Sequence, residues 1–314
     1  MNKETITTIK ENLKKVMIGN ENTIELVLIA LAADGNILLE DVPGTGKTVL
    51  AKSLARSIEA SFGRIQFTPD LLPSDVTGQN ILDQRSNSFT FVKGPAFCNI
   101  LLADEINRAT PKVQSALLEC MAERQITVDG VTYPMAKPFL VIATQNPIET
   151  LGTFPLPEAQ LDRFLIKLSM ENLSAECELA LIDRYMKDEP LATLDAVASS
   201  DDILALQKEV KDVYIHPDLK KYLVDIIQAT RESKDIITGV SPRGTLAFVR
   251  AVSACALING RDYVVPEDIK YMAPYVLSHR ITTVASFDSD NTARAVIESI
   301  MASLTLPTEN WSTR

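Results

Sequence analysis

The chain has 314 residues, of which 46% are hydrophobic and 23% charged, ordinary proportions for a folded globular protein. Collagen-like, coiled-coil and wholly disordered classes are therefore excluded, and the length predicts about two domains. Acidic residues (41) outnumber Lys and Arg (31), which gives a formal net charge of -10. This balance disfavours a protein whose main task is to coat phosphate backbones, so nucleic acid is not an expected partner.

The N-terminal region has no pattern typical of export or membrane insertion. Its apolar run from Leu26 to Ala33 falls far short of the ~20 residues needed to cross a bilayer. Charged residues occupy the opening segment, where a secretory signal requires an apolar stretch. We therefore expect a cytoplasmic protein without a membrane span. The four cysteines lie far apart with no histidine cluster beside them, and are expected to be buried structural thiols.

Up to about residue 170, short apolar runs alternate with helical patterns, which is typical of a parallel sheet covered by helices on both faces. Apolar residues at three-to-four spacing predict a helix over 6–16, and another is expected over 23–33. Thr110 followed by Pro111 predicts a helix start. The predicted strands are Asn36 to Leu39, Arg64 to Phe67, Ile100 to Ala103, Phe139 to Ala143 and Leu165 to Leu168.

Two inserts, at about residues 71–92 and 125–134, interrupt this alternation, and each is predicted to contain a β-hairpin. The first hairpin covers Ile81 to Val92. The second covers Ile126 to Tyr133 and turns at Asp129-Gly130, a strong signal for a two-residue hairpin loop. We expect both inserts to belong to an α/β core at residues 1–170.

After residue 170 the strand signals fade and helical patterns dominate. Ser174 is a predicted helix cap, and Pro217, Pro242 and Pro266 each stand near a predicted helix start. The sequence therefore predicts a small, all-helical second domain at residues 171–314.

A glycine-rich turn follows the first predicted strand and leads into a helix. Gly44 and Gly46 would let backbone N–H groups turn inward toward phosphate, Lys47 would reach the β- and γ-phosphates, and the Thr48 hydroxyl could ligate Mg²⁺. Asp41 stands where the usual P-loop pattern begins with Gly, and is expected to be tolerated at a negative φ. The predicted ATP-binding residues are Val42, Pro43, Gly44, Thr45, Gly46, Lys47, Thr48 and Val49.

Polar side chains end two later strands. Asp104 is placed to hold Mg²⁺ through water, as in a Walker B motif, which leaves Glu105 to polarise an attacking water. Their adjacency on one strand end does not suit glycosidase chemistry, which needs carboxylates on opposite sides of a sugar ring. Because the carboxyl ends of parallel strands gather at one edge, Asn146 is expected beside Glu105, where an amide can orient water.

These motifs together resemble the MoxR family of AAA+ ATPases, in the helix-two-insert branch. The resemblance runs from Val16 to about Arg280, and the combination is far more specific than a P-loop alone. It is carried by LLEDVPGTGKT (38–48), LLADEINRATPKVQSALLECMAERQITVDG (101–130), PFLVIATQNPIE (138–149), GTFPLPEAQLDRF (152–164), GVSPRG (239–244) and NGRDYVVPEDI (259–269).

The resemblance implies a P-loop NTPase αβα sandwich with a helical lid, and a ring, commonly a hexamer, that binds ATP at subunit interfaces. By similarity, Ile18 and Gly19 would line the adenine cleft, and Glu105 would be the general base. Asn146 matches the sensor-one residue. Arg163 matches a proposed arginine finger for the neighbouring subunit, and Arg243 matches the sensor-two arginine. The hairpin loops would face the ring pore.

The family resemblance also implies a chaperone-like factor that remodels or matures protein clients, with partners that carry von Willebrand factor A domains. One alternative is the ATPase subunit of a metal chelatase. A nucleic-acid motor is disfavoured by the net charge and by hairpins without a basic, aromatic stripe. A nucleotide-gated scaffold is disfavoured because it would not need Glu105. Arg108, close to Glu105, is a rival to Arg163 for the trans-acting role.

Overall fold

The computed structural model describes residues 3–40, 44–85, 87–146, 152–170, 172–186, 189–284, 289–308 and 311. The chain packs into two units, each assembled from separate stretches of sequence. The first comprises Met1–Glu25, Asn36–Leu156 and Leu168–Leu204, and the second comprises Leu26–Gly35, Pro157–Lys167 and Ala205–Arg314. The domain boundary expected near residue 170 stays a prediction.

A five-stranded sheet has the order β2-β5-β8-β1-β9. Its strands are β1 (Ile37–Glu40), β2 (Phe62–Gln66), β5 (Ile100–Asp104), β8 (Leu140–Gln145) and β9 (Ile166–Leu168). The pairings of β2 with β5, β5 with β8 and β8 with β1 are parallel. All five predicted strands are confirmed. β5 lies between β2 and β8, and its first four residues form a continuous apolar run because every residue of the strand is buried.

Helices precede, separate and follow these strands along the chain, and all but the one at Ala175–Tyr185 bury apolar residues. These helices are α1 (Lys3–Lys14), α2 (Glu21–Ala32), α3 (Lys47–Ser57), α5 (Pro111–Glu123), α7 (Ala175–Tyr185) and α8 (Ser200–Glu209), with a short α4 (Pro73–Thr77). In α1 the predicted stripe is confirmed, since Ile9 and Leu13 are almost inaccessible to solvent. Thr110 is the N-cap of α5, as predicted, but its side chain makes no capping hydrogen bond. Ser174 caps α7 by accepting from Cys177 N.

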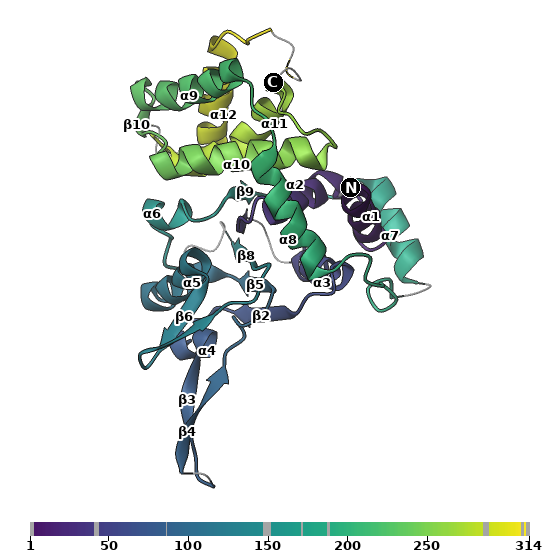
Figure 1. The fold of residues 1–314 in the computed structure, drawn as a ribbon, viewed down its shortest axis with the longest axis vertical. Helices are drawn as coiled ribbons and strands as arrows, with labels where there is room; N and C mark the ends of the chain where they lie inside the picture. Colours follow the sequence, from purple (N-terminus) through teal and green to yellow (C-terminus); the bar gives the residue numbers. More distant parts are fainter. Residues whose placement is uncertain are drawn as a thin grey trace. The chain divides into compact units, whose positions relative to one another are not determined.

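Both predicted hairpins are present in the first unit. The first pairs β3 (Gly78–Asp83) with β4 (Ser88–Lys93), and Figure 1 shows it as a long two-stranded arm. The second pairs β6 (Gln125–Val128) with β7 (Val131–Pro134). Its turn residues Asp129 and Gly130 both have positive φ, 47° and 80°, which suits the predicted two-residue turn. Phe91 stacks on Tyr133 with ring centroids 4.2 Å apart, which joins the two hairpins.

Four long helices dominate the second unit: α9 (Pro217–Glu232), α10 (Pro242–Ile258), α11 (Pro266–Leu277) and α12 (Ser289–Ser303). The first three begin at the prolines predicted to start helices, where the missing N–H costs no helical hydrogen bond. The prediction of an all-helical domain needs one correction. A two-stranded antiparallel ribbon joins β10 (Ile236–Thr238) to β11 (Thr282–Thr283), because the segment after α11 extends and pairs rather than coiling.

Two further features are the hydropathy of the helices and the burial of the cysteines. None of the helices in the described part of the chain is both long and apolar enough to cross a bilayer. Cys98, Cys120 and Cys255 are buried, as expected, whereas Cys177 on the first turn of α7 is only partly covered. Burial raises the pKa of the Cys98 and Cys120 thiols to about 12.

Candidate active site

The phosphate loop ends at Gly46, the N-cap of α3. Gly44 and Gly46 have φ of 93° and 92°, the left-handed region that glycine adopts without strain. A Cβ on Gly44 would have no atom of the described residues within 4 Å, so that side of the turn is open to a ligand. The open turn and the helix N-terminus that follows it, where N–H groups have no acceptor one turn earlier in the helix, fit an anion. Asp41, Val42 and Pro43 lie outside the described residues.

The loop borders a cavity of about 200 Å³ in the first unit. Its lining consists of Gly44, Thr45, Gly46, Lys47, Thr48, Arg64, Gln66, Asp104, Glu105, Thr144 and Asn146. The structure thus gathers the loop, both carboxylates and the amide that the sequence predicts at one edge of the sheet. Val49 follows Thr48 in α3 and is not part of this lining. Arg64, Gln66 and Thr144 are site residues that were not predicted.

Asp104 is 8% exposed and has partners from two neighbouring strands. Arg64 Nε donates to Asp104 Oδ2 over 2.7 Å, and Thr144 Oγ1 lies 3.4 Å from Oδ1. Mg²⁺ prefers oxygen ligands, and Asp104 and Thr48, whose side chains carry such oxygens, both line the cavity. This donor set fits a magnesium ion beside bound phosphates.

Glu105 has an unusual backbone for a residue other than glycine, with φ 56° and ψ 49°. Its N–H donates to Thr144 Oγ1 over 2.9 Å, which holds this conformation. Its carboxylate Oε2 accepts from Gln66 Nε2 over 2.9 Å and pairs with Arg108 NH1 at 3.2 Å. A strained residue with its carboxylate held by two donors is typical of a functional position.

Strand pairing explains why Arg64 and Gln66 on β2 belong to the site. Arg64 and Gln66 occupy alternate positions, and Gln66 pairs in register with Asp104. Alternate residues of a strand share one face, so both side chains reach the same edge. The period-two spacing of the two polar residues in the sequence was the available signal, but it identifies a site only once β2 is known to lie beside β5.

Asn146 is buried beside the cavity and close to the short helix η1 (Ile106–Arg108). Asn107 Nδ2 lies 3.4 Å from the Asn146 carbonyl, and the Asn107 carbonyl accepts from Phe154 N over 2.6 Å. Gln114 Nε2 donates to the Phe154 carbonyl over 2.8 Å. Polar groups that follow Glu105 therefore brace the chain on both sides of residues 147–151, which are not described.

The segment that carries Ile18 and Gly19 adjoins the phosphate loop, since a Cβ on Gly46 would lie 3.7 Å from Met17 Cε. Gly19 has φ 74°, and a Cβ there would lie 2.8 Å from Cys177 Sγ. Glycine is therefore required at this position by both conformation and space. The adenine contact of Ile18 and Gly19 stays a prediction.

The two predicted catalytic arginines belong to the second unit. Arg163 follows α6 (Glu158–Leu161) by two positions and is partly covered, whereas Arg243 is the exposed second residue of α10. Ser241 caps α10 by accepting from Gly244 N over 3.0 Å. The roles of Arg163 and Arg243 toward ATP stay predictions.

The chain matches an ATPase family model, and relatives are similar to it along almost its whole length. Residues 36–166 match the family model described as ATPase family associated with various cellular activities (AAA), and residues 228–300 match an AAA lid domain. The uncharacterised protein YeaC of Bacillus subtilis is 48% identical over 306 residues, 97% of this chain and 95% of the relative. Chaperone MoxR1 of Mycobacterium tuberculosis is 41% identical over 308 residues, 95% of this chain and 81% of the relative.

A solved structure agrees with the fold as well. A crystal structure of a protein from Cytophaga hutchinsonii, assigned as an ATPase, superposes with a TM-score of 0.89 at 40% identity and covers 98% of this chain and 96% of its own. The parallel five-stranded sheet, the helical lid region and the predicted family are thereby confirmed. The chain belongs to the MoxR family of AAA ATPases.

Proposed function

We propose that this protein is a cytoplasmic, Mg²⁺-dependent ATPase that hydrolyses ATP to ADP and phosphate and uses the energy to remodel or mature protein clients. One observation carries the chemical part of this proposal. The phosphate loop, Asp104, Glu105 and Asn146 line the same cavity. These are the parts that phosphoryl transfer to water requires, namely a phosphate cradle, a cation site and a base that positions the water.

Binding rests on the loop and the start of α3. Backbone N–H groups around Gly44 and Gly46 donate to the phosphates, and Lys47 adds a positive charge that faces them. Thr48 and Asp104 would hold Mg²⁺, which neutralises charge that develops on the phosphate oxygens. Asp104 must then exchange its partner Arg64 for the cation or share its carboxylate between the two.

Hydrolysis rests on Glu105 as the general base. Gln66 and Arg108 hold one carboxylate oxygen, Oε2, so the other oxygen can take the proton of the attacking water. Asn146 would help to orient that water through its amide. The left-handed backbone of Glu105 fixes the direction in which its side chain leaves the strand.

The remaining parts of the machine depend on assembly. We propose a homo-oligomeric ring, a hexamer by family resemblance, in which Arg163 completes the ATP site of the neighbouring subunit and Arg243 contacts the γ-phosphate of its own. A protein with a von Willebrand factor A domain is the proposed partner. The name of the relative MoxR1, a chaperone, supports a role on protein clients. Co-purification with client proteins on a hydrolysis-deficient variant tests that role.

The central experiment compares Glu105→Gln with wild type. The amide keeps the shape but accepts no proton, so we expect ATP affinity to remain and turnover to fall by about 10² to 10⁴. Glu123→Gln on α5 is the matched control, because it makes the same change at an exposed position. Normal turnover by Glu105→Gln would move the base to another residue.

Lys47→Ala tests nucleotide binding separately. This variant should lose ATP binding while its melting temperature stays unchanged.

A further inference from the structure

A buried arginine, Arg280, lies at the centre of a polar network in the second unit. It follows α11 in the short helix η3 (Ser278–Arg280), and its side chain is 2% exposed. Burial lowers the pKa of its guanidinium to about 10, against the opposing effect of Asp162, so it stays charged at neutral pH. Asp162 Oδ1 lies 2.7 Å from Arg280 Nε and supplies the opposite charge.

Every N–H of the Arg280 guanidinium has an acceptor. Nε donates to the Asp162 carboxylate, NH1 to the carbonyls of Leu165 and Val276, and NH2 to the carbonyls of Asp162 and Phe164. An arginine has five such donors in a planar arrangement, so this set of acceptors defines its orientation completely. The NH2 partners are the residues immediately before and after Arg163. The guanidinium therefore holds the backbone on both sides of the proposed arginine finger.

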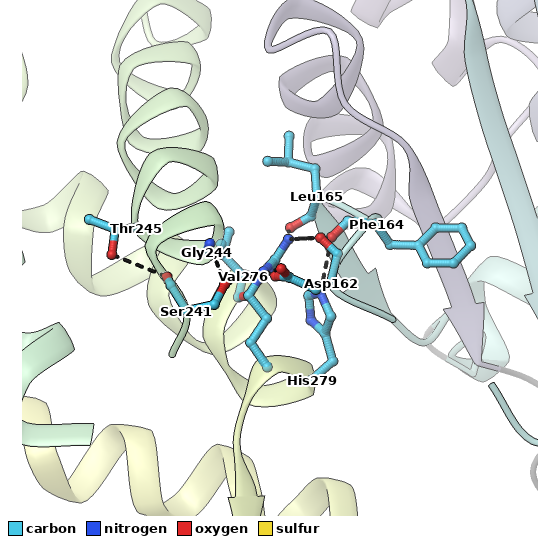
Figure 2. A network of polar contacts seen from close by, with 9 residues as sticks. Asp162, Phe164, Leu165, Ser241, Gly244, Thr245, Val276 and His279 are labelled. Carbon is cyan, nitrogen blue, oxygen red and sulfur yellow. Dashed lines mark hydrogen bonds and ion pairs between the residues drawn. The ribbon is translucent and has the colours of Figure 1, made fainter. Parts of the chain in front are cut away.

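The same network reaches the helix that carries Arg243. Ser241 Oγ donates to Asp162 Oδ2 over 3.1 Å while it accepts from Gly244 N as the N-cap of α10 (Figure 2). Arg243 stands between Ser241 and Gly244 in the sequence. Gly244 also touches the arginine stem, because a Cβ on Gly244 would lie 2.9 Å from Arg280 Cδ. Segments far apart in the sequence thus meet at one carboxylate.

Stability alone does not account for this arrangement. A buried ion pair gains little over a well-packed apolar contact, because both charges lose their hydration. Hydrogen bonds, in contrast, are directional, and a fully satisfied buried network specifies one geometry. The expected benefit of the network is therefore the fixed placement of the two segments that it joins.

We propose that Arg280, Asp162 and Ser241 are positioning residues for the ATPase reaction, which hold the backbone around Arg163 and the start of the Arg243 helix as one rigid body. The inference rests on the proposed function, in which Arg163 serves the neighbouring subunit's ATP and Arg243 its own. Any movement of the second unit that brings Arg243 to one ATP then also moves Arg163. The network is a mechanical link between adjacent ATP sites of a ring.

A matched pair of substitutions at Ser241 tests this link without removing a buried charge. Aspartate and asparagine are both good N-caps, so each preserves the bond from Gly244 N. The asparagine amide can still donate to Asp162, whereas an aspartate carboxylate cannot and adds like charge beside it. The two variants therefore differ in the one contact that the proposal needs.

Steady-state turnover at saturating ATP is measured together with thermal melting. Because small misplacements of catalytic groups are costly, Ser241→Asp should lower kcat about ten- to hundredfold at a nearly unchanged melting temperature. Ser241→Asn should stay within about twofold of wild type, since it restores the donor. The fold-loss in kcat caused by Ser241→Asp should be clearly smaller in an Arg163→Ala background than in the wild-type protein, because part of its effect acts through Arg163.

The outcomes separate the possible failures. Equal kcat for Ser241→Asp and Ser241→Asn, or fully multiplicative losses with Arg163→Ala, would overturn the positioning role. If Arg163→Ala and Arg243→Ala both keep wild-type turnover, the proposed roles of these arginines are wrong and the inference falls with them. Should Ser241→Asp not fold, Arg280→Lys replaces it. It keeps the charge but has three donors for five acceptors, and unchanged kcat in that variant would contradict the proposal.

Discussion

Arg64 Nε lies 2.7 Å from Asp104 Oδ2, so the carboxylate proposed to bind magnesium is paired with a cation from the neighbouring strand. The Arg64 side chain is 49% exposed, and such partly solvated pairs contribute at most about 1 kcal/mol. Because Arg64 and Mg²⁺ compete for one carboxylate, Arg64→Ala should lower the half-saturating Mg²⁺ concentration about two- to fivefold. Magnesium titration of nucleotide binding measures this shift.

A matched control for this titration is Arg85→Ala, which removes the same charge from an exposed position of the first hairpin loop. It should leave the magnesium requirement unchanged. A higher magnesium requirement in Arg64→Ala would mean that Arg64 helps to bind the nucleotide rather than competing with the cation.

Arg108 NH1 lies 3.2 Å from Glu105 Oε2 of its own chain, which favours a role within its own subunit. We therefore expect Arg163 to be the trans-acting arginine. Arg163→Ala should lose about 10³ to 10⁵ in turnover and keep ATP affinity. Mixed with Glu105→Gln, it should regain activity, because in a randomly mixed ring about a quarter of the head-to-tail interfaces pair an intact Glu105 with an intact Arg163.

The control mixture replaces Arg163→Ala with Arg108→Ala. If Arg108 serves its own Glu105, a mixture with Glu105→Gln contains no subunit with both groups, and activity stays low. Recovery in this mixture and none in the first would make Arg108 the arginine that crosses the interface.

Cys177 should report on the adenine cleft. Cys177 adjoins Gly19 and is less buried than the other cysteines. The thiols of Cys98 and Cys120 have a pKa of about 12, so at pH 8 only about one part in 10⁴ of each is the reactive thiolate. We expect a thiol reagent to label Cys177 first in the native protein. ATP should slow that labelling, as followed by mass spectrometry of the labelled peptide.

The labelling experiment has a built-in comparison, because tripolyphosphate can occupy the phosphate loop but has no adenine. It should protect Cys177 much less than ATP does. Equal protection by the two compounds would place the adenine away from Gly19.

His279 should make stability depend on pH. Burial, with the adjacent Arg280 charge, holds the pKa of His279 well below 6.5, so the folded protein keeps the ring neutral. Below pH 6.5 the unfolded chain binds a proton that the folded chain does not, so stability falls as pH falls. Between pH 7 and 5.5 the free energy of unfolding should drop by about 1 kcal/mol from this group. Urea unfolding at several pH values measures the drop.

His279→Gln provides the reference for this dependence. The variant can itself be less stable, but its unfolding free energy should change less between pH 7 and 5.5 than that of wild type. The same pH dependence in both proteins would assign the effect to another group.

Local sequence patterns were sufficient for the strands and for most of the site. The phosphate loop combines glycine conformations with a helix start within a few residues, and Asp104 and Glu105 directly end a buried strand. The grouping of Asn146 with Glu105 needed only the rule that parallel strands end at one edge. These features depend on short-range geometry, which is readable in the order of residues.

Contacts between distant segments were decided by the tertiary structure alone. Arg64 reaches Asp104 only because β2 pairs with β5, and the spacing of polar residues along β2 does not state its neighbour. Arg280 meets Asp162 across 118 positions, and its burial exists only after the helices have packed. The physical reason is that backbone propensity acts over a few residues, whereas pairing, burial and charge compensation depend on which segments the whole fold brings together.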